Sequence, residues 1–340
     1  MPRSERYIAL MSRVTTQLRF IEPQLASPVD QPPEGKHWIH EIKYDGYRSQ
    51  VLLERGEARV FTRNGYDWSE RYPSIIRTAS GLRCESAIID GEAIVQDGDG
   101  ASDFDSLNAA MRWRPASIIL YAFDLMHLDG TDLRQLSLSV RRSMLKGLIG
   151  KDDESRIQFS EEFVGDGAVL FKACAEHGLE GIISKQALAP YRSGRSKTWL
   201  RTKCFTESTF VVVGMDRDRQ TGALRALLAD PNSEGLRYAG AAFIALGDDA
   251  RTEFLAEVER LTTSWAAFKS SRLTDVKWCR PKLTVRVKHL AGSKLYRSIL
   301  SCSVFGLRAP VINSTLTMTK EAIAITTRTR TPFHRLAGCT

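Results

Sequence analysis

Short apolar runs alternate with polar turns through the first part of the chain, up to about Phe205. Runs rich in β-branched and aromatic residues that end at glycine-containing turns predict strands, with helices between them. The expected strands are Trp38–Lys43, Tyr47–Glu54, Ala58–Thr62, Ser86–Val95, Ile118–Leu125 and Leu179–Lys185. The expected helices are Ser69–Ser80, Ser139–Ile149 and Gly167–His177, the last of which stops at Gly178 as helices often do. This mixture predicts a large α+β unit.

The pattern changes after Phe205, where short strands follow one another with a single helix among them. The expected strands are Thr209–Met215, Leu224–Leu228, Leu236–Ala245 and Leu283–Lys288, and the helix is Thr252–Thr262. Several short strands with one helix suit a small Greek-key barrel of the OB type. We therefore expect a mixed α/β domain over residues 20–205 and an OB-type barrel over 206–310, between flexible segments at 1–19 and 311–340, the second of them basic.

The composition suits a globular protein of the cytosol. Apolar residues make up 43% of the chain, which supports packed cores rather than disorder. No apolar run approaches the ~18 residues that cross a bilayer, and the N-terminus lacks the basic-then-apolar layout of a secretory signal. The six cysteines are too dispersed for a zinc site or a redox pair, so we expect free thiols. A cytosolic protein without a membrane partner follows from these observations.

The net charge of +8 favours a polyanionic partner. A basic surface raises the local concentration of polyanions and speeds their capture. Many basic proteins bind no nucleic acid, so the charge by itself does not identify the partner.

The main chemical signal is the octapeptide Glu41-Ile-Lys43-Tyr-Asp45-Gly46-Tyr-Arg48. A lysine becomes a nucleophile only when it can lose its proton, which partial desolvation near a strand end makes feasible. Asp45-Gly46 predicts a tight turn that orients the lysine and brings the backbone close to a ligand. Taken alone, the octapeptide fits a surface hairpin with alternating charges equally well.

Further segments follow the octapeptide in a fixed order. They are Thr62-Arg63-Asn64-Gly65, Asp90-Gly91-Glu92, Phe123-Asp124-Leu125, Glu180-Gly181-Ile182-Ile183-Ser184-Lys185 and Trp199-Leu200-Arg201-Thr202-Lys203. Each has a physical role if the ligand is a nucleoside triphosphate. The carboxylates of Glu92 and Glu180, on buried strands, are natural Mg²⁺ ligands, because an unpaired buried charge is costly.

The other segments supply positive charge and a surface for a base. Lys185, Arg201 and Lys203 can offset the charge of the α-phosphate. Phe123 can stack on a purine, and Glu41 can accept a hydrogen bond from an exocyclic amine, which would favour adenine over guanine. Singly, each residue has an ordinary explanation: Phe123 as core filler, Glu92 as a salt-bridged strand residue, and the three cations as a solvated face.

Together, the segments resemble the nucleotidyltransferase motifs of ATP-dependent DNA ligases, with the greatest likeness to bacterial end-joining ligases, from about Gln24 to Arg308. The K-x-D-G-x-R element also occurs in RNA ligases and mRNA capping enzymes. A DNA ligase is favoured by the combination of this element with five further elements: Glu41, Arg63-Asn64-Gly65, Glu70-Arg71-Tyr72-Pro73, Phe123-Asp124-Leu125 and Trp199 to Lys203. The resemblance implies an ATP-grasp-like adenylation domain followed by an OB-fold. Related ligases can be fused to polymerase and nuclease modules, for which 340 residues leave no room.

The resemblance also implies roles for individual residues, with ATP as substrate and Mg²⁺ or Mn²⁺ as the metal. Lys43 would accept AMP, with Asp45 as a second catalytic candidate, and Glu41 would contact adenine. The remaining roles are sugar or 5′-phosphate contacts for Arg48 and Arg63, metal and ribose contacts for Glu92 and Glu180, base stacking for Phe123, and phosphate contacts for Arg201 and Lys203.

Two parts of the sequence depart from the family pattern. Arg201 stands where the family often has lysine, which preserves the charge but alters the geometry of its contacts. The segment from Lys288 to Arg297 follows the family's last motif only loosely. Lys294 and Arg297 are candidates for contacts to pyrophosphate or DNA, and an ordinary barrel strand and loop explains the segment equally well.

The expected function is that of an ATP-dependent DNA ligase that seals 5′-phosphate/3′-OH breaks in duplex DNA through a lysyl-AMP intermediate, in DNA repair and end joining. The expected partners are nicked or broken duplex DNA and, as a further candidate, a DNA-end-binding protein. We expect a monomer of the bacterial cytosol. The alternatives are an RNA ligase or capping-type nucleotidyltransferase and, more remotely, an inactive basic DNA-binding module.

Overall fold

The chain divides into two compact units, and each is considered by itself. The computed structural model describes residues 17–98, 100–163, 165–231, 236–268, 275–290 and, for the backbone alone, 303–308. Among these, the first unit comprises residues 17–167 and Ile183–Arg201, and the second comprises Ala168–Ile182 and the described residues from Thr202 onward. The predicted domain ranges 20–205 and 206–310 stay predictions.

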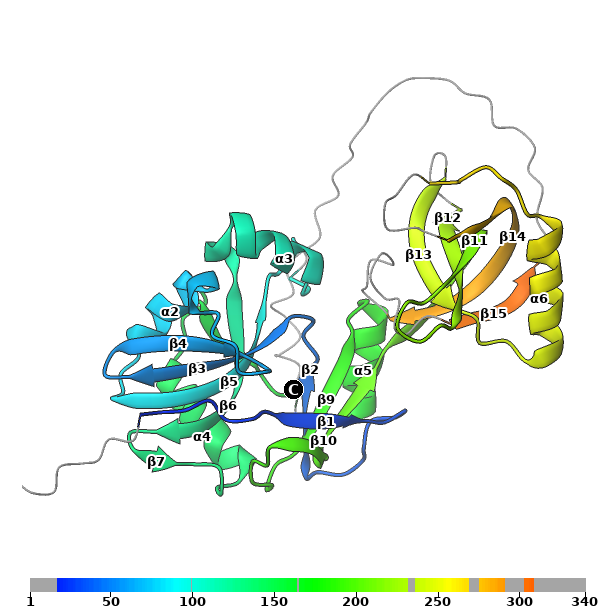
Figure 1. The fold of residues 1–340 in the computed structure, drawn as a ribbon. Helices are drawn as coiled ribbons and strands as arrows, with labels where there is room; N and C mark the ends of the chain where they lie inside the picture. The colour runs from blue at the N-terminus through cyan, green and yellow to red at the C-terminus, as the bar shows by residue number, and fades with distance from the viewer. Residues whose placement is uncertain are drawn as a thin grey trace, which may run out of the picture. The chain divides into compact units, whose positions relative to one another are not determined.

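The first unit is built on a six-stranded sheet, in which five strands follow the order β4-β3-β5-β6-β7 (Figure 1). The sixth strand, β8, pairs with β6. Its strands are β3 (Tyr47–Glu54), β4 (Glu57–Thr62), β5 (Ser86–Ile94), β6 (Ile119–Leu128), β7 (Thr131–Asp132) and β8 (Ile157–Phe159). All neighbours are antiparallel except β6 and β8. The register of β3 on β5 sets Arg48 opposite Glu92, so residues from two of the motifs lie side by side.

A second sheet of four strands has the order β1-β10-β9-β2. Its strands are β1 (Gln24–Pro28), β2 (Trp38–Ile42), β9 (Gly181–Gln186) and β10 (Gly194–Lys203). The strands β9 and β10 contain the last two motifs, and β2 leads into the lysine motif. This sheet therefore collects at one place motifs that are about 160 residues apart along the chain.

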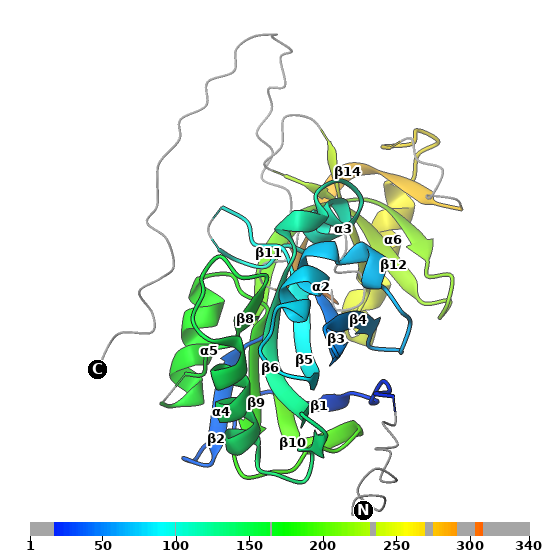
Figure 2. The same ribbon diagram turned by 90° about the vertical axis from the view of Figure 1, so that its left-hand side faces the viewer.

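Two hydrophobic cores lie on opposite faces of the six-stranded sheet. Alternating residues of its strands point to opposite sides, as the period of a strand requires. On one face, Val51 and Ile89 pack with residues of the helices α2 (Pro73–Ser80), α3 (Phe104–Trp113) and α4 (Leu138–Ile149). On the other face, Leu52 and Ile88 pack with Phe123 and with residues of the four-stranded sheet, such as Trp199. Phe123 is thus held between two sheets. Strands of these two sheets, such as β6 and β9, lie close together in Figure 2.

The second unit contains a closed barrel in the order β11-β12-β13-β15-β14. Its strands are β11 (Phe205–Arg217), β12 (Leu224–Asp230), β13 (Arg237–Phe243), β14 (Lys277–Leu290) and β15 (Ser303–Arg308). The remaining α-helices of the described residues are α5 (Gly167–Glu176) and α6 (Asp248–Arg260). The long strands β11 and β14 pair antiparallel from Phe205 opposite Leu290 to Met215 opposite Lys277. Five strands closed in this way correspond to the predicted OB-type barrel.

Local chemistry explains where the predicted elements and the structure differ. The segment expected as one helix, Ser69–Ser80, is a 3₁₀ turn (Ser69–Arg71) followed by α2, which starts at Pro73. Proline lacks an N–H and is favoured at the first position of a helix. Ser69 does not cap this helix; its hydroxyl accepts a hydrogen bond from the N–H of Val60 at 2.9 Å.

Helix α3 was not predicted, although its start carries a recognisable signal. Asp103 precedes it with an extended backbone and accepts hydrogen bonds from the N–H groups of Asp105 and Ser106, which is the arrangement of an N-cap. The expected flexible segments fall almost entirely outside the described residues, as do Lys294 and Arg297. No helix in the described part of the chain is long and apolar enough to span a bilayer.

Gly46 is required by the close approach of the lysine loop to β5. A Cβ atom at this position would overlap the carbonyl oxygen of Ala93 and would lie 2.7 Å from Cγ2 of Ile94. We therefore expect Gly46→Ala to lower the free energy of unfolding by about 1–3 kcal/mol through overpacking, measured by urea denaturation. Gly147, exposed in α4 with open space where a Cβ atom would stand, is the matched control. Gly147→Ala should stabilise the protein by about 0.5–1 kcal/mol, and equal effects of the two variants would contradict the close-contact explanation.

Candidate active site

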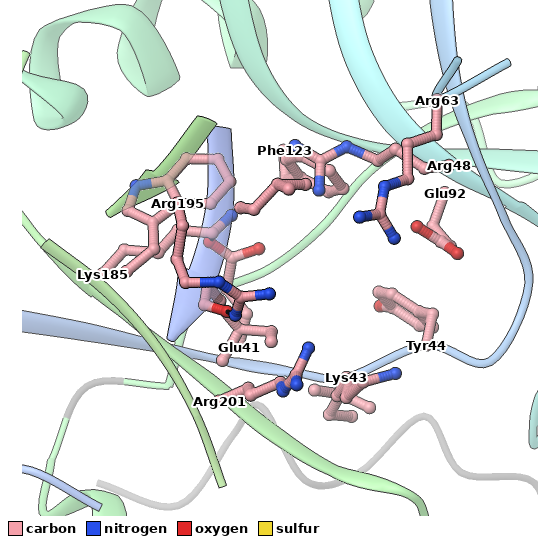
Figure 3. A pocket seen from close by; sticks show the side chains of 15 residues that line it. Glu41, Lys43, Tyr44, Arg48, Arg63, Glu92, Phe123, Lys185, Arg195 and Arg201 are labelled. Atoms are coloured by element: carbon pink, nitrogen blue, oxygen red, sulfur yellow. Dashed lines mark hydrogen bonds and ion pairs between the residues drawn. The ribbon is translucent and has the colours of Figure 1, made fainter. Parts of the chain in front are cut away.

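A cavity in the first unit gathers most of the residues that the motifs predicted (Figure 3). Its lining residues come from both sheets, from the loop between β2 and β3, and from the turn that follows β4. They are Leu25, Ala26, Glu41, Ile42, Lys43, Tyr44, Arg48, Arg63, Glu92, Phe123, Ile183, Lys185, Arg195, Trp199 and Arg201. Eight of the predicted site residues therefore share one cavity, which a solvated face or an ordinary hairpin would not produce.

The loop that bears Lys43 is held from two sides. The N–H of Asp45 donates a hydrogen bond to Oγ of Ser102 at 2.9 Å, and Gly46 rests against β5. On the other side, Tyr44 stacks on Tyr121 with ring centroids 4.4 Å apart. Asp45 lies in the loop beside the cavity and is not one of its lining residues. The loop brings its backbone close to β5 at Gly46. The predicted approach of this backbone to a ligand stays a prediction.

Glu41 is buried at the inner end of the cavity and is surrounded by donors. Its Oε1 atom accepts a hydrogen bond from Nη1 of Arg142 at 2.9 Å and lies 2.7 Å from Nζ of Lys185. Its Oε2 atom accepts a hydrogen bond from Oγ of Ser160 at 2.9 Å. A buried carboxylate is stable only when it is paired and hydrogen-bonded in this way. Glu41 is thus fixed in position before any ligand arrives.

Phe123, Trp199 and Lys185 form the wall next to Glu41. Phe123 and Trp199 meet edge to face with ring centroids 6.0 Å apart. The ammonium of Lys185 lies 4.1 Å from the centroid of Phe123 and 4.5 Å from that of Trp199. Lys185 was predicted to contact the α-phosphate; the structure places it beside Glu41 and Phe123, the two residues predicted to bind the base. Its phosphate role stays a prediction.

The burial of Lys185 has a pH-dependent consequence for stability. Desolvation lowers the pKa of its ammonium to about 8; Glu41 opposes this shift and Arg142 adds to it. Because the pKa is lower in the folded state than in the unfolded state, the cost of burying the charge is present below pH 8 and is relieved as the pH rises toward 10.5. We expect the wild-type protein to gain stability relative to Lys185→Met over this interval, measured by urea denaturation at several pH values. A difference that stays constant with pH would contradict the lowered pKa.

Arg48 is held in place by Asp90 on the neighbouring strand. Its Nε and Nη2 atoms donate to Oδ1 and Oδ2 of Asp90 at 2.7 and 2.8 Å, a bidentate geometry. The hydroxyl of Tyr191 donates to the same Oδ2 atom at 2.8 Å. The guanidinium also lies 4.5 Å from the centroid of Phe123. Arg48 therefore forms a rigid cationic side of the cavity.

Arginine side chains near Lys43 suit the binding of phosphate groups. Arg63, Arg195 and Arg201 line the cavity together with Lys43 and Glu92 (Figure 3). Nε of Arg201 is buried and has no hydrogen-bond partner within the described part of the chain. A buried donor without a partner is costly, so it is suited to a ligand that supplies an oxygen. Guanidinium groups match phosphate oxygens in geometry as well as in charge.

Glu180 and Lys203 belong to the second unit and pair with each other there. Nζ of Lys203 lies 3.3 Å from Oε1 of Glu180, and the N–H of Cys204 donates to the carbonyl of Glu180 at 2.9 Å. Their predicted roles toward metal and phosphate stay predictions. Within the described residues, no three His, Cys, Asp or Glu side chains cluster closely enough to hold a metal ion.

The sequence motifs did not identify the residues that hold Glu41 and Arg48 in place. Arg142 and Ser160 fix Glu41, Asp90 fixes Arg48, and Arg195 adds a positive charge to the cavity. A signal for Arg142 was present in the sequence: it occupies an inward position of a predicted helix, where an apolar residue is expected. Nothing in the sequence places Ser160 beside Glu41.

Comparison with known proteins agrees with this site. The family model described as ATP dependent DNA ligase domain matches residues 23–203. The multifunctional non-homologous end joining protein LigD of Pseudomonas aeruginosa is 37% identical over 285 residues, which cover 81% of this chain and 34% of that protein. A probable DNA ligase of Sorangium cellulosum is 30% identical over 79% of this chain and 53% of its own length. The chain thus spans about a third of the LigD relative and about half of the Sorangium relative.

Solved structures identify the fold. A mycobacterial DNA ligase D complexed with ATP and MES matches with a TM-score of 0.52 and 27% identity, covering 84% of this chain and 94% of that one. The ligase domain of Mycobacterium tuberculosis LigD matches with a TM-score of 0.51 and 26% identity over 84% of this chain and 94% of that domain. These matches confirm the predicted fold class, an adenylation domain with an OB-fold. Since the family model covers residues 23–203 of the 340, the chain belongs to the ATP-dependent DNA ligase family.

Proposed function

We propose that this chain joins 5′-phosphate and 3′-OH ends in duplex DNA with ATP, through an AMP group carried by Lys43. The observation that supports this proposal best is the cavity, where Lys43 lies with a buried carboxylate, an aromatic wall and several arginines. Membership of the ATP-dependent ligase family supports the use of ATP. The net charge of +8 supports a nucleic-acid substrate.

In the first step, the neutral amine of Lys43 attacks the α-phosphorus of ATP. A nitrogen–phosphorus bond forms, and the bond from that phosphorus to the oxygen between the α- and β-phosphates breaks. Pyrophosphate then leaves with that oxygen. The ammonium loses one proton to solvent before the attack, and the nitrogen loses a second proton to solvent as the lysyl-AMP phosphoramidate forms. Arg63, Arg195 and Arg201 offset the negative charge that collects around the phosphorus.

The inner end of the cavity suits the adenine base. Phe123 offers an aromatic surface between the two sheets, and Glu41 offers a fixed carboxylate that can accept a hydrogen bond from an exocyclic amine. Arg48 stays immobile beside Phe123 because Asp90 holds it. Pre-formed contacts of this kind lower the entropic cost of binding.

Two further transfers complete the reaction. An oxygen of the 5′-phosphate at a break attacks the phosphorus of lysyl-AMP, the nitrogen–phosphorus bond breaks, and the nitrogen of Lys43 takes up a proton from solvent to become an amine again. The neighbouring 3′-OH then attacks the 5′-phosphorus, loses its proton, forms the phosphodiester bond and releases AMP. Such phosphoryl transfers depend mainly on in-line positioning and charge neutralisation.

A divalent metal fits one part of this site. Glu92 lines the same cavity as Lys43, and Mg²⁺ in proteins is commonly held by one or two carboxylates together with substrate phosphates. Glu92 would therefore hold Mg²⁺ or Mn²⁺ with help from the triphosphate. When bound, such an ion neutralises phosphate charge. We keep Glu180 as a second candidate ligand.

The setting of this activity is also part of the proposal. Relatives are named as end-joining proteins, which supports a role in double-strand break repair and a DNA-end-binding protein as a partner. We propose a monomer that acts in the bacterial cytosol on nicked or broken duplex DNA.

The deciding experiment is a sealing assay on a nicked duplex with a 5′-phosphate and a 3′-OH. The same protein is tested with ATP, GTP and NAD in parallel, and with an RNA nick of equal sequence. We expect sealing of the DNA nick with ATP. Sealing of RNA alone would identify an RNA ligase, use of GTP would indicate a capping-type enzyme, and the lack of any covalent AMP adduct would leave an inactive DNA-binding module.

A further inference from the structure

Arg142 connects the two residues that form the inner end of the cavity. It lies on α4 and is 2% exposed. Its Nη1 atom donates to Oε1 of Glu41 at 2.9 Å and to the carbonyl oxygen of Phe123 at 3.2 Å. Its Nη2 atom donates to the carbonyl oxygen of Ser160 at 2.7 Å, and its guanidinium lies 4.6 Å from the ring centroid of Phe159. One side chain thus fixes both Glu41 and the backbone of Phe123.

The donors around Glu41 leave little of its carboxylate for a ligand. An ionised carboxylate offers about four acceptor positions. Arg142 and Lys185 approach Oε1, and Ser160 donates to Oε2. Two hydrogen bonds and one close ammonium therefore leave at most two acceptor positions, on a side chain that lines the cavity. A directed acceptor distinguishes a donor from an acceptor on a ligand, because a second acceptor placed there would be left unpaired and repelled.

We propose that Arg142 is a positioning residue for base recognition, which orients Glu41 as an acceptor and so selects a 6-amino purine over a 6-oxo purine. This inference rests on the proposed function. Arg142 acts from behind the cavity wall, since it is not among the lining residues. Its hydrogen bond to the carbonyl of Phe123 fixes the position of the Phe123 ring relative to the Glu41 carboxylate.

The neighbouring Arg141 provides a matched control. It is also buried on α4, but its donors go elsewhere: Nε and Nη2 bind the carboxylate of Asp124 at 2.7 and 2.8 Å. Its Nη1 atom donates to the carbonyls of Leu136 and Ala189. Substitution of either arginine removes a buried guanidinium from the same helix, whereas only Arg142 bonds Glu41.

The experiment measures covalent labelling of the full chain by α-labelled ATP and by α-labelled inosine triphosphate, which has an oxygen in place of the 6-amino group. We expect the wild-type protein to prefer ATP. In Arg142→Gln, the ratio of the two labelling efficiencies should fall by about 10- to 100-fold, the worth of an oriented hydrogen bond to a charged group. The loss should appear in the nucleotide concentration for half-maximal labelling, because the phosphate contacts are unchanged.

The ratio separates a positioning role from a general loss of stability. Both nucleotides meet the same preparation, so a smaller folded fraction lowers both rates and leaves the ratio unchanged. Arg142→Lys, which keeps one cationic donor group, should recover part of the preference, and Arg141→Lys should retain the wild-type ratio. An unchanged ratio in Arg142→Gln, or an equal fall in Arg141→Lys, would overturn the inference. Absence of labelling in the wild type would instead overturn the proposed function.

Discussion

Replacement of Lys43 by alanine should abolish the transfer of AMP to the protein, with labelling by α-labelled ATP reduced by at least about 10³-fold. The alanine side chain has no nitrogen to form the phosphoramidate, while the remaining cavity residues are untouched. The measurement is the radioactivity that stays with the protein after denaturing electrophoresis. Joining of nicked DNA with ATP should be lost in parallel, because the first step supplies the AMP for the others.

Two controls separate the nucleophile from a general defect. Lys43→Arg keeps the positive charge but provides no nucleophilic amine, because a guanidinium stays protonated, so it should behave like the alanine variant. A nick that already carries 5′-linked AMP should still be sealed by Lys43→Ala, since the last step makes no bond to this lysine. Labelling of Lys43→Ala at the wild-type level would show that the nucleophile is another residue.

Replacement of Asp124 by alanine should lower the free energy of unfolding by about 3–5 kcal/mol. Asp124 and Arg141 form an ion pair whose side chains are both fully buried, with Nε–Oδ1 at 2.7 Å. Without the carboxylate, the guanidinium of Arg141 stays buried with an uncompensated charge, and this strongly destabilises the folded state. Urea denaturation followed by intrinsic tryptophan fluorescence measures the change, because Trp199 packs in the core that adjoins Asp124.

The matched comparisons test whether burial is the cause. Asp132→Ala removes an exposed carboxylate that pairs with Arg134, and it should cost less than about 1 kcal/mol. The double variant Asp124→Leu/Arg141→Met replaces the buried pair by apolar side chains of similar size and should recover most of the loss. If the double variant is as unstable as Asp124→Ala, an unpaired charge is not the origin of the effect.

The site could be predicted from the sequence as far as its residues belong to ordered motifs. Lys43, Glu92 and Phe123 were each ambiguous alone, and their order along the chain assigned them to one nucleotide-binding function. The structure places all three in one cavity. Phe123 also shows that two interpretations can both hold, since it lines the cavity and packs in the core between the sheets. The roles of these residues in the reaction remain predictions that the variants above test.

The residues behind the site could not be predicted, because their partners are distant in the sequence. Arg142 and Ser160 reach Glu41 across 101 and 119 residues, and Tyr191 reaches Asp90 across 101. No local period relates positions so far apart. The role of Lys185 illustrates the same limit: its charge suggested a phosphate, and only the pairing of β9 with β2 placed it beside Glu41.

The amino-acid sequence by itself determined the fold class, the change from an α+β unit to a series of short strands, and the chemistry available at Lys43. These follow from local periodicity, turn residues and the order of the motifs, which need no knowledge of distant contacts. The tertiary structure decided which charges pair and which remain for a ligand. Glu41 and Arg48 are held in fixed positions because buried charges must be paired. The packing of the two sheets against each other determined which partners were available to them.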